Sequence, residues 1–170
     1  FVPESFPQIS LDEIATMSEM SYSERAFKVL SRYLTDFSES ELMDCINGAY
    51  GTKFDEMGVC PLHYTEDKVA VMELYHGPTL AFKDVALQIL PHFLKHAKGK
   101  EKEDATVLIL VATSGDTGKA ALEGYRDVDG VKIEVFYPVD GVSKNQKKQM
   151  ATQEGGNVRV CAIRGNFDDA

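Results

Sequence analysis

The chain has 170 residues, of which 44% are hydrophobic and 26% are charged, and its formal net charge is -9. This length and composition are typical of a globular chain with its own core, and they argue against disorder. The acidic balance argues against a nucleic-acid partner, because phosphate backbones are bound mainly by clustered Lys and Arg.

The cysteines and histidines indicate neither a disulfide framework nor a metal site. Cys45, Cys60 and Cys161 are widely spaced and include no Cys-x-x-Cys pair, so a reducing cytoplasm is the simplest setting. His63 lies close to Cys60, and His92 and His96 have helical spacing, but no third ligand is in register with them, so we expect no metal. We expect no membrane partner either, because no apolar run approaches the roughly 20 residues that span a bilayer.

The first third of the chain is predicted to be helical. Ser21 or Ser23 can cap a segment in which apolar residues recur every three or four positions from 26 to 34. That spacing is the pattern of a helix with one buried face.

A second helix is predicted after Ser38. Ser38 and Glu41 have the spacing of a capping box ahead of another apolar pattern, and Gly48 with Gly51 marks its end. Residues 54–66 have no clear period and are expected to connect two regions.

From residue 69 onward, strands are predicted to alternate with helices. The strands are expected over Val69 to Tyr75, Val107 to Ala112, Val131 to Tyr137 and Val158 to Ile163, with helices after Lys83, from Thr117, and over Lys144 to Thr152. This order indicates an α/β fold with a mostly parallel sheet and flanking helices. We therefore divide the chain into a helical region, 1–66, and an α/β region, 67–170.

Two details of the α/β region carry further expectations. Val107 to Ala112 is apolar on both faces, as a central parallel strand should be. Pro91 would remove one N–H and clash with the preceding turn, so the helix after Lys83 should kink or break near Leu87.

A lysine lies where a Gly-Pro turn meets a predicted helix. Lys83 follows Ala81-Phe82 and precedes Val85-Ala86-Leu87. A lysine amine forms a Schiff base with an aldehyde only when it is unprotonated, which requires a partly buried, water-poor setting. The apolar neighbours of Lys83 can supply that setting. The alternative is a solvated lysine in the first turn of a helix.

A glycine-rich turn follows the strand that ends at Ala112. Its residues are Thr113, Ser114, Gly115, Asp116, Thr117, Gly118 and Lys119. Unpaired amides and the positive end of a helix dipole would favour a carboxylate or phosphate there. The alternative is a plain connection in which Ser114 or Asp116 caps the helix. A P-loop is excluded, because that motif needs four residues between its glycines and a Ser or Thr where Ala120 stands.

These two segments together resemble those of one enzyme family. The segment from His76 to Asp84 is similar to the cofactor-lysine segment of the threonine synthases, which are pyridoxal-phosphate enzymes of fold type II. The segment from Thr113 to Ala121 is similar to the glycine-rich turn of the subgroup with Asp in that turn. Further similarity covers Phe1 to Glu4, Tyr137 to Met150 and Gly165 to Asp169, so the resemblance spans nearly the whole chain.

The resemblance implies a cofactor, a reaction and a set of site residues. It implies that pyridoxal 5'-phosphate is bound as a Schiff base by Lys83, beside Phe82, and that Lys83 is the catalytic residue that moves protons. The implied lyase reaction, which belongs to threonine biosynthesis, converts the small molecule O-phosphohomoserine and water to threonine and phosphate. The implied substrate-binding residues are Thr113, Ser114, Gly115, Asp116 and Thr117, with Lys119 near the leaving phosphate.

Asp116 has two possible roles under this resemblance. Many relatives have Asn at this point, facing the 3'-oxygen of the cofactor, but an ionised Asp cannot donate a hydrogen bond. Either a proton is shared between Asp116 and that oxygen, which is the interpretation we favour, or Asp116 points elsewhere and caps the helix.

Two alternatives to an active threonine synthase stay open on the sequence. Family members are much longer, Phe1 is not a start methionine and the chain stops at Ala170, so we expect an incomplete chain that lacks the cofactor-phosphate loop. The parent enzyme is a threonine synthase, or else a threonine-synthase-like phospho-lyase or Ser/Thr dehydratase of the same fold. The chain alone can also be a catalytically silent fragment. We expect a monomer or a homodimer in the cytoplasm.

Overall fold

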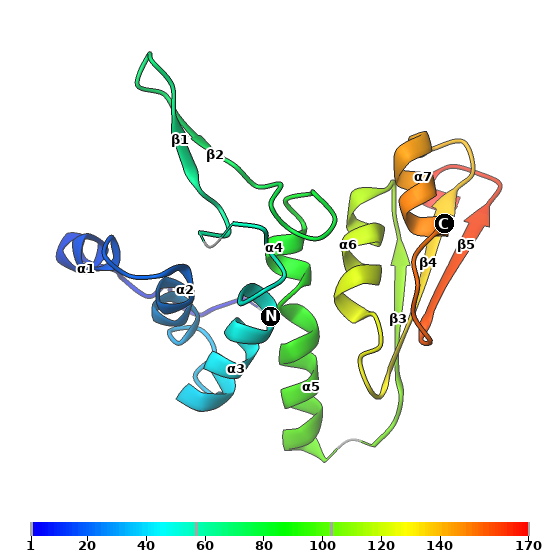
Figure 1. Cartoon of the computed structure of the whole chain (residues 1–170). Helices are drawn as coiled ribbons and strands as arrows, with labels where there is room; N and C mark the ends of the chain where they lie inside the picture. The colour runs from blue at the N-terminus through cyan, green and yellow to red at the C-terminus, as the bar shows by residue number, and fades with distance from the viewer. Residues whose placement is uncertain (1, 57, 103, 170) are drawn as a thin grey trace.

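The computed structural model describes residues 2–56, 58–102 and 104–169 of the chain. A helical N-terminal segment leads to a β-hairpin, a pair of consecutive helices and a three-stranded parallel sheet with its own helices (Figure 1). The predicted α/β class with a parallel sheet and a helical N-terminal segment is confirmed.

The N-terminal segment contains α1 (Leu11–Met17), α2 (Tyr22–Leu30) and α3 (Glu39–Tyr50). Each begins with a capping box, in which a serine hydroxyl and a glutamate side chain accept each other's backbone N–H groups. The cap predicted at Ser38 and the end at Gly51 are confirmed, whereas Gly48 lies inside α3. Helix α1 was not predicted, although Ser10 and Glu13 have the same capping-box spacing.

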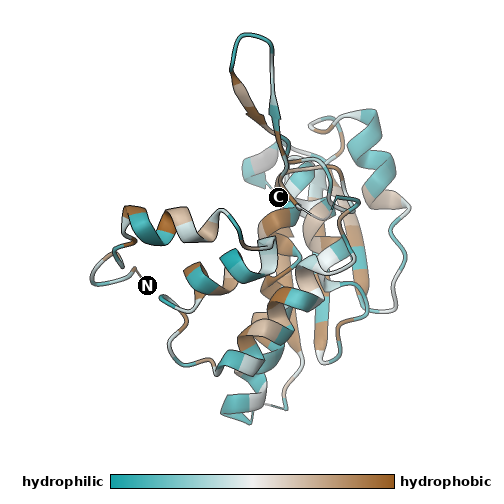
Figure 2. Cartoon of the chain, turned by 60° about the vertical axis from the view of Figure 1, so that its left-hand side comes forward, coloured by the Kyte–Doolittle hydropathy of each residue, from teal (hydrophilic) through white to brown (hydrophobic). Residues whose placement is uncertain are grey.

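The strand expected over Val69 to Tyr75 belongs to a hairpin and not to the parallel sheet. β1 (Leu62–Tyr64) and β2 (Ala70–Met72) pair antiparallel, and the hairpin projects from the body (Figure 2). Apolar side chains of both strands, such as Leu62 and Met72, are exposed. Residues 54–66, which were expected to connect two regions, contain β1. The turn at Lys83 follows the hairpin and does not follow a strand of the parallel sheet. An alternating apolar pattern predicts a strand but does not identify its partner.

Pro91 interrupts the helical segment after Lys83, as predicted. α4 (Asp84–Leu87) is a single turn, and α5 (Leu90–Glu101) carries Pro91 in its first turn. Proline is tolerated there because N–H groups of the first turn have no acceptor within the helix. The Tyr50 hydroxyl donates to the Val85 carbonyl oxygen at 2.7 Å. The short helix α4 is thereby tied to α3.

The parallel sheet has the strand order β3-β4-β5, with β3 (Val107–Ala112), β4 (Val131–Pro138) and β5 (Val158–Ile163). Helix α6 (Asp116–Tyr125) joins β3 to β4, α7 (Lys144–Ala151) joins β4 to β5, and a 3-10 turn (Phe167–Asp169) follows. The expectation that Val107 to Ala112 is the central strand was wrong, because β4 is central. Leu108 and Leu110 are 54% and 63% exposed, so one apolar face of β3 lies outside the core.

The apolar core consists of two clusters. In the first, Leu122 of α6 and Met150 of α7 pack with the buried side chains of β4, so both helices cover the same face of the sheet. In the second, Ile46 of α3 packs with Ile89 at the start of α5. The second cluster includes residues from both sides of the boundary at 66 and 67, and that division stays a prediction.

Candidate active site

Lys83 lies at the N-cap position of α4, where the turn after the hairpin becomes helical. Its carbonyl oxygen accepts the N–H groups of Ala86 and Leu87. Its side chain is half-buried, and Nζ lies 4.7 Å from the centroid of the Phe82 ring. No carboxylate of the described residues lies within ion-pair distance of this amine. Lys83 is therefore neither deeply buried nor fully solvated, and its amine forms no ion pair with the described residues.

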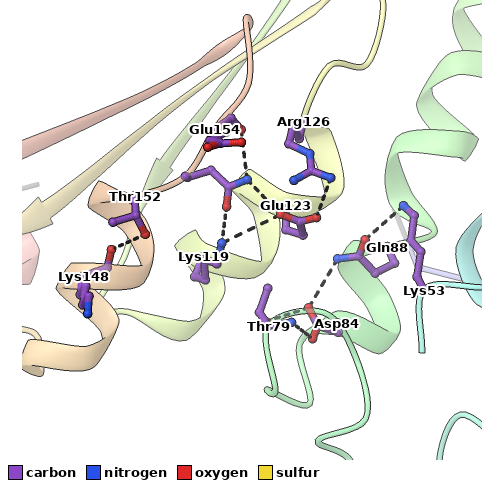
Figure 3. A network of polar contacts seen from close by, with 11 residues as sticks. Lys53, Thr79, Asp84, Gln88, Lys119, Glu123, Arg126, Lys148, Thr152 and Glu154 are labelled. Carbon is purple, nitrogen blue, oxygen red and sulfur yellow. Dashed lines mark hydrogen bonds and ion pairs between the residues drawn. The ribbon is translucent and has the colours of Figure 1, made fainter. Parts of the chain in front are cut away.

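Asp84, the next residue, is completely buried and holds the turn that precedes α4. Its carboxylate accepts the backbone N–H and the hydroxyl of Thr79, both at 2.8 Å, and the side-chain amide of Gln88 at 3.4 Å (Figure 3). A Cβ at Gly77 would lie 2.5 Å from Asp84 Oδ2, so glycine is needed beside this carboxylate. The hydrogen bonds compensate the buried charge and fix the turn that presents Lys83.

Thr113 organises the glycine-rich turn in the same way. Its side chain is buried, and Oγ1 accepts the N–H groups of Gly115 and Gly118 at 3.0 Å each. A Cβ at Gly118 would lie 2.4 Å from Thr113 Cγ2. Gly115 has a φ of 144°, a conformation that side chains rarely adopt. Both glycines are therefore required by the geometry of the turn.

The start of α6 presents backbone donors that the protein itself does not use. The N–H groups of Ser114, Asp116 and Thr117 have no hydrogen-bond partner within the described part of the chain. Neither Ser114 nor Asp116 caps this helix, so the capped connection given as the alternative is not present, and Thr113 Oγ1 instead accepts the Gly118 N–H of the first turn. The Gly115 amide, expected to bind a ligand as well, already donates to Thr113. The turn can receive an anion at the positive end of the helix dipole.

The two turns lie at the same end of the molecule. Helix α4 packs against α6, and Figure 1 shows the start of each helix at the upper end of the sheet. A Cβ at Gly124 of α6 would lie 2.2 Å from the Leu87 carbonyl oxygen, so the two backbones are in direct contact. A half-buried amine and a turn with unused N–H donors are thus carried by two helices that touch.

Comparison with known proteins points to one family. The family described as "Threonine synthase N terminus" matches residues 1–50. The chain is 42% identical over 170 residues to threonine synthase from Pseudomonas aeruginosa, covering 99% of the chain and 36% of that protein. It is 37% identical over 177 residues to threonine synthase from Schizosaccharomyces pombe, covering 99% and 34%.

The structural comparison agrees. A crystal structure of PLP-bound threonine synthase from Brucella melitensis matches with a TM-score of 0.89 and 37% identity, over 99% of the chain and 36% of that protein. Over nearly its whole length, the chain is therefore similar to part of the threonine synthases. The chain spans about a third of the length of the curated relatives it matches: 36% of the Pseudomonas aeruginosa protein and 34% of the Schizosaccharomyces pombe protein.

Asp116 faces α7. Its Oδ1 accepts a hydrogen bond from the side-chain amide of Gln146 at 2.7 Å. The contact is not a helix cap. Whether Asp116 shares a proton with a cofactor oxygen stays a prediction. Gln146 was not singled out in the sequence, and the signal that could have found it is its capping-box spacing from Ser143.

Lys119 of α6 is mostly buried, with 15% of its side chain exposed, so it is not a solvated residue of the first helical turn. Its Nζ donates to Gln153 Oε1 and lies 4.0 Å from Glu123 Oε2, and Glu123 also pairs with Arg126 at 3.3 Å (Figure 3). Burial lowers the pKa of the Lys119 amine, and the Glu123 carboxylate opposes that shift. Lys119 therefore already has partners in the protein, and its contact with a phosphate stays a prediction.

The sequence gave no signal for Lys53, which is linked to the Lys83 turn through Gln88. Its Nζ donates to Gln88 Oε1 at 3.2 Å, and the amide end of Gln88 donates to Asp84 (Figure 3). Burial lowers the pKa of the Lys53 amine. Lys53 thus supplies a positive charge two hydrogen bonds away from the buried carboxylate.

His76 joins the segment before Lys83 to an earlier loop. Its Nδ1 lies 2.7 Å from Asp55 Oδ1 and its Nε2 lies 2.7 Å from Glu73 Oε2. Hydrogen bonding to Glu73 raises the pKa of His76, burial opposes the shift, and Asp55 adds to it. Because both ring nitrogens are engaged by carboxylates, the protonated imidazole fits this clamp best.

Two further searches of the described ranges gave no candidates. No helix there is long and apolar enough to cross a membrane. No group of three or more His, Cys, Asp and Glu side chains that could hold a metal ion lies among the residues described.

Proposed function

We propose that the protein carrying this chain is a threonine synthase, a lyase that converts O-phosphohomoserine and water to threonine and phosphate. The similarity to threonine synthases supports the reaction. The observation that carries the site is the contact between α4 and α6, which places the free amine of Lys83 and the unused amides of the Thr113 turn at one end of the fold.

Pyridoxal 5'-phosphate fits the residues that this chain contributes. An aldehyde cofactor needs an amine that is sheltered but free of a carboxylate partner, and Lys83 meets both conditions. The PLP in the Brucella melitensis structure supports the same choice of cofactor. When bound, the cofactor stabilises negative charge on the substrate carbons. Lys83 would hold it covalently, with Phe82 and Asp116 as neighbours, in the manner of a fold type II enzyme.

The chain's own residues then perform three tasks. The Lys83 amine moves protons to and from the substrate carbons, which requires the fixed position that Asp84 gives its turn. The free N–H groups of Ser114, Asp116 and Thr117 bind the substrate carboxylate at the N-terminus of α6. Thr113 fixes the backbone of the turn that carries those N–H donors, because its hydroxyl oxygen accepts the neighbouring N–H groups of Gly115 and Gly118.

The lysine assignment is tested by chemical trapping. The complete gene product is incubated with pyridoxal phosphate and reduced with borohydride, and its peptides are weighed. We expect a pyridoxyl group on Lys83 and none in the Lys83→Arg variant, which keeps the positive charge. A pyridoxyl group on Lys53 or Lys119, the other partly buried lysines near this site, would overturn the assignment.

The reaction is tested with O-phosphohomoserine. We expect threonine and phosphate in equal amounts from the complete protein. Phosphate release with 2-oxobutanoate as the only carbon product would instead assign a phospho-lyase or dehydratase.

We also propose a cytoplasmic location. Cys45, Cys60 and Cys161 are all free thiols, as expected in a reducing compartment.

A further inference from the structure

Gln146 is the N3 residue of α7, and its carboxamide is oriented by contacts at both ends. The side-chain Oε1 of Gln146 accepts the backbone N–H of Ser143 at 3.1 Å, and the backbone N–H of Gln146 donates to Ser143 Oγ at 3.3 Å. With the oxygen committed to the cap, the NH₂ end is directed away from it and donates to Asp116 Oδ1 at 2.7 Å. Exchange of the amide oxygen and nitrogen would set donor against donor and acceptor against acceptor, so this orientation is fixed.

The same carboxamide rests on the glycine-rich turn. A Cβ at Gly115 would lie 2.4 Å from Gln146 Cδ and within 2.7 Å of both terminal atoms. Gly115 is therefore needed to admit Gln146 as well as to form the turn. The first turns of α6 and α7 meet at this point, and α6 and α7 are in contact.

The side-chain conformation of Asp116 depends on its contact with Gln146. Asp116 is exposed, it begins α6, and within the described chain Gln146 is the partner of its carboxylate. An exposed aspartate has no packing to fix its rotamer, so the hydrogen bond from Gln146 fixes it. One carboxylate oxygen is thereby occupied, and Oδ2 is left for a ligand.

We propose that Gln146 is a positioning residue that holds Asp116 against the cofactor in the proposed threonine synthase reaction. This inference rests on the proposed function. The residue acts from a neighbouring helix: Ser143 orients Gln146, Gln146 orients Asp116, and Asp116 meets the bound cofactor.

The decisive variant is Gln146→Glu. Glutamate keeps an oxygen for the Ser143 N–H, so the cap of α7 survives, but it replaces the donor to Asp116 with a second carboxylate oxygen. Like charges at hydrogen-bond distance repel, and Asp116 should leave its place. In the complete protein we expect about tenfold weaker pyridoxal phosphate binding and a shifted absorption spectrum of the bound cofactor. Gln146→Met keeps the side-chain length without a new charge and should give a smaller change of the same kind.

Two controls separate positioning from simple stability. Ser143→Ala weakens the α7 cap but leaves the Gln146–Asp116 pair, so it should lower the melting temperature without altering the cofactor spectrum. In the double variant Gln146→Glu with Asp116→Asn, the new Asn amide can donate a hydrogen bond to the new Glu carboxylate, which reverses the direction of the original bond. This variant should recover the stability that Gln146→Glu loses in the cofactor-free protein, but not the spectrum, because the carboxylate now lies on α7.

The inference is overturned if Gln146→Glu binds the cofactor with the wild-type affinity and spectrum, or if Ser143→Ala alters the spectrum equally. It is also overturned if the double variant recovers no stability, since the two side chains would then not be in contact. If the wild-type protein does not bind pyridoxal phosphate, the proposed function fails instead. The stability comparison still tests the contact in that case.

Discussion

The buried carboxylate of Asp84 accepts both the backbone N–H and the hydroxyl of Thr79, at 2.8 Å each. This pair closes the turn from which Lys83 projects, and it places a charge in a site with no exposed surface. The position of the reactive amine therefore depends on a side chain that cannot itself touch solvent.

Replacement of Asp84 by Asn tests that dependence. An Asn NH₂ group in place of Oδ2 would face the Thr79 N–H, and in place of Oδ1 it would face the amide of Gln88, which is also a donor. We therefore expect a loss of about 1 to 3 kcal/mol in the free energy of unfolding. Thr79→Val removes only the hydroxyl and should cost about 1 kcal/mol. Urea unfolding measures both, and borohydride trapping should show slower labelling of Lys83 in the Asp84 variant. Wild-type stability in Asp84→Asn would contradict the structure.

Thr113→Val should damage the anion-binding turn with little change in side-chain volume. The N–H groups of Gly115 and Gly118 would lose their acceptor, at a cost of about 1 to 3 kcal/mol. We expect weaker substrate binding, seen as a raised KM for O-phosphohomoserine. Thr113→Ser keeps the hydroxyl and should retain most of both properties. Equal losses in the two variants would show that the methyl group, and not the hydroxyl, organises the turn.

Gly124→Ala should separate the two helices that carry the site. The new Cβ would lie 2.2 Å from the Leu87 carbonyl oxygen, and overpacking against backbone costs about 1 to 3 kcal/mol. The matched control is Gly99→Ala in α5, where a Cβ meets nothing within 4 Å. That change should stabilise the protein by up to about 1 kcal/mol through helix propensity. Thermal unfolding of the two variants distinguishes close packing from a general preference for glycine.

The His76 clamp predicts a pH dependence of stability. Because the folded protein raises the pKa of His76, the stabilisation is fully present below the ordinary histidine pKa of about 6.5. It is lost as the pH rises through the raised value. Unfolding measured from about pH 6 to pH 9 should show this decline in the wild type and less of it in His76→Gln. Parallel curves for the two proteins would contradict the clamp.

Local signals were sufficient for much of the fold. The parallel strands are rich in β-branched residues and have clear ends, the cap at Ser38 is a capping box, and the break at Pro91 follows from the missing N–H. Lys83 and the Thr113 turn were found because each motif is contiguous in the sequence.

Contacts between distant segments were not predictable in this way. Lys53 reaches Gln88 across 35 residues, and Gln146 reaches Asp116 across 30. Neither pair leaves a periodic pattern, since each is formed by tertiary packing. The central place of β4 was missed for the same reason, because apolar content on both faces of a strand does not specify which neighbours it has.

The single turn of α4 has a practical consequence for engineering. A helix of 4 residues has little cohesion of its own, so its direction is set by Tyr50, Gln88 and the Asp84 turn around it. To shift the reactive amine by a fraction of an ångström, one would leave Lys83 and its neighbours untouched and redesign Tyr50 or Gln88. Changes at these two residues would move the Lys83 amine without altering Lys83 itself or the Thr113 turn.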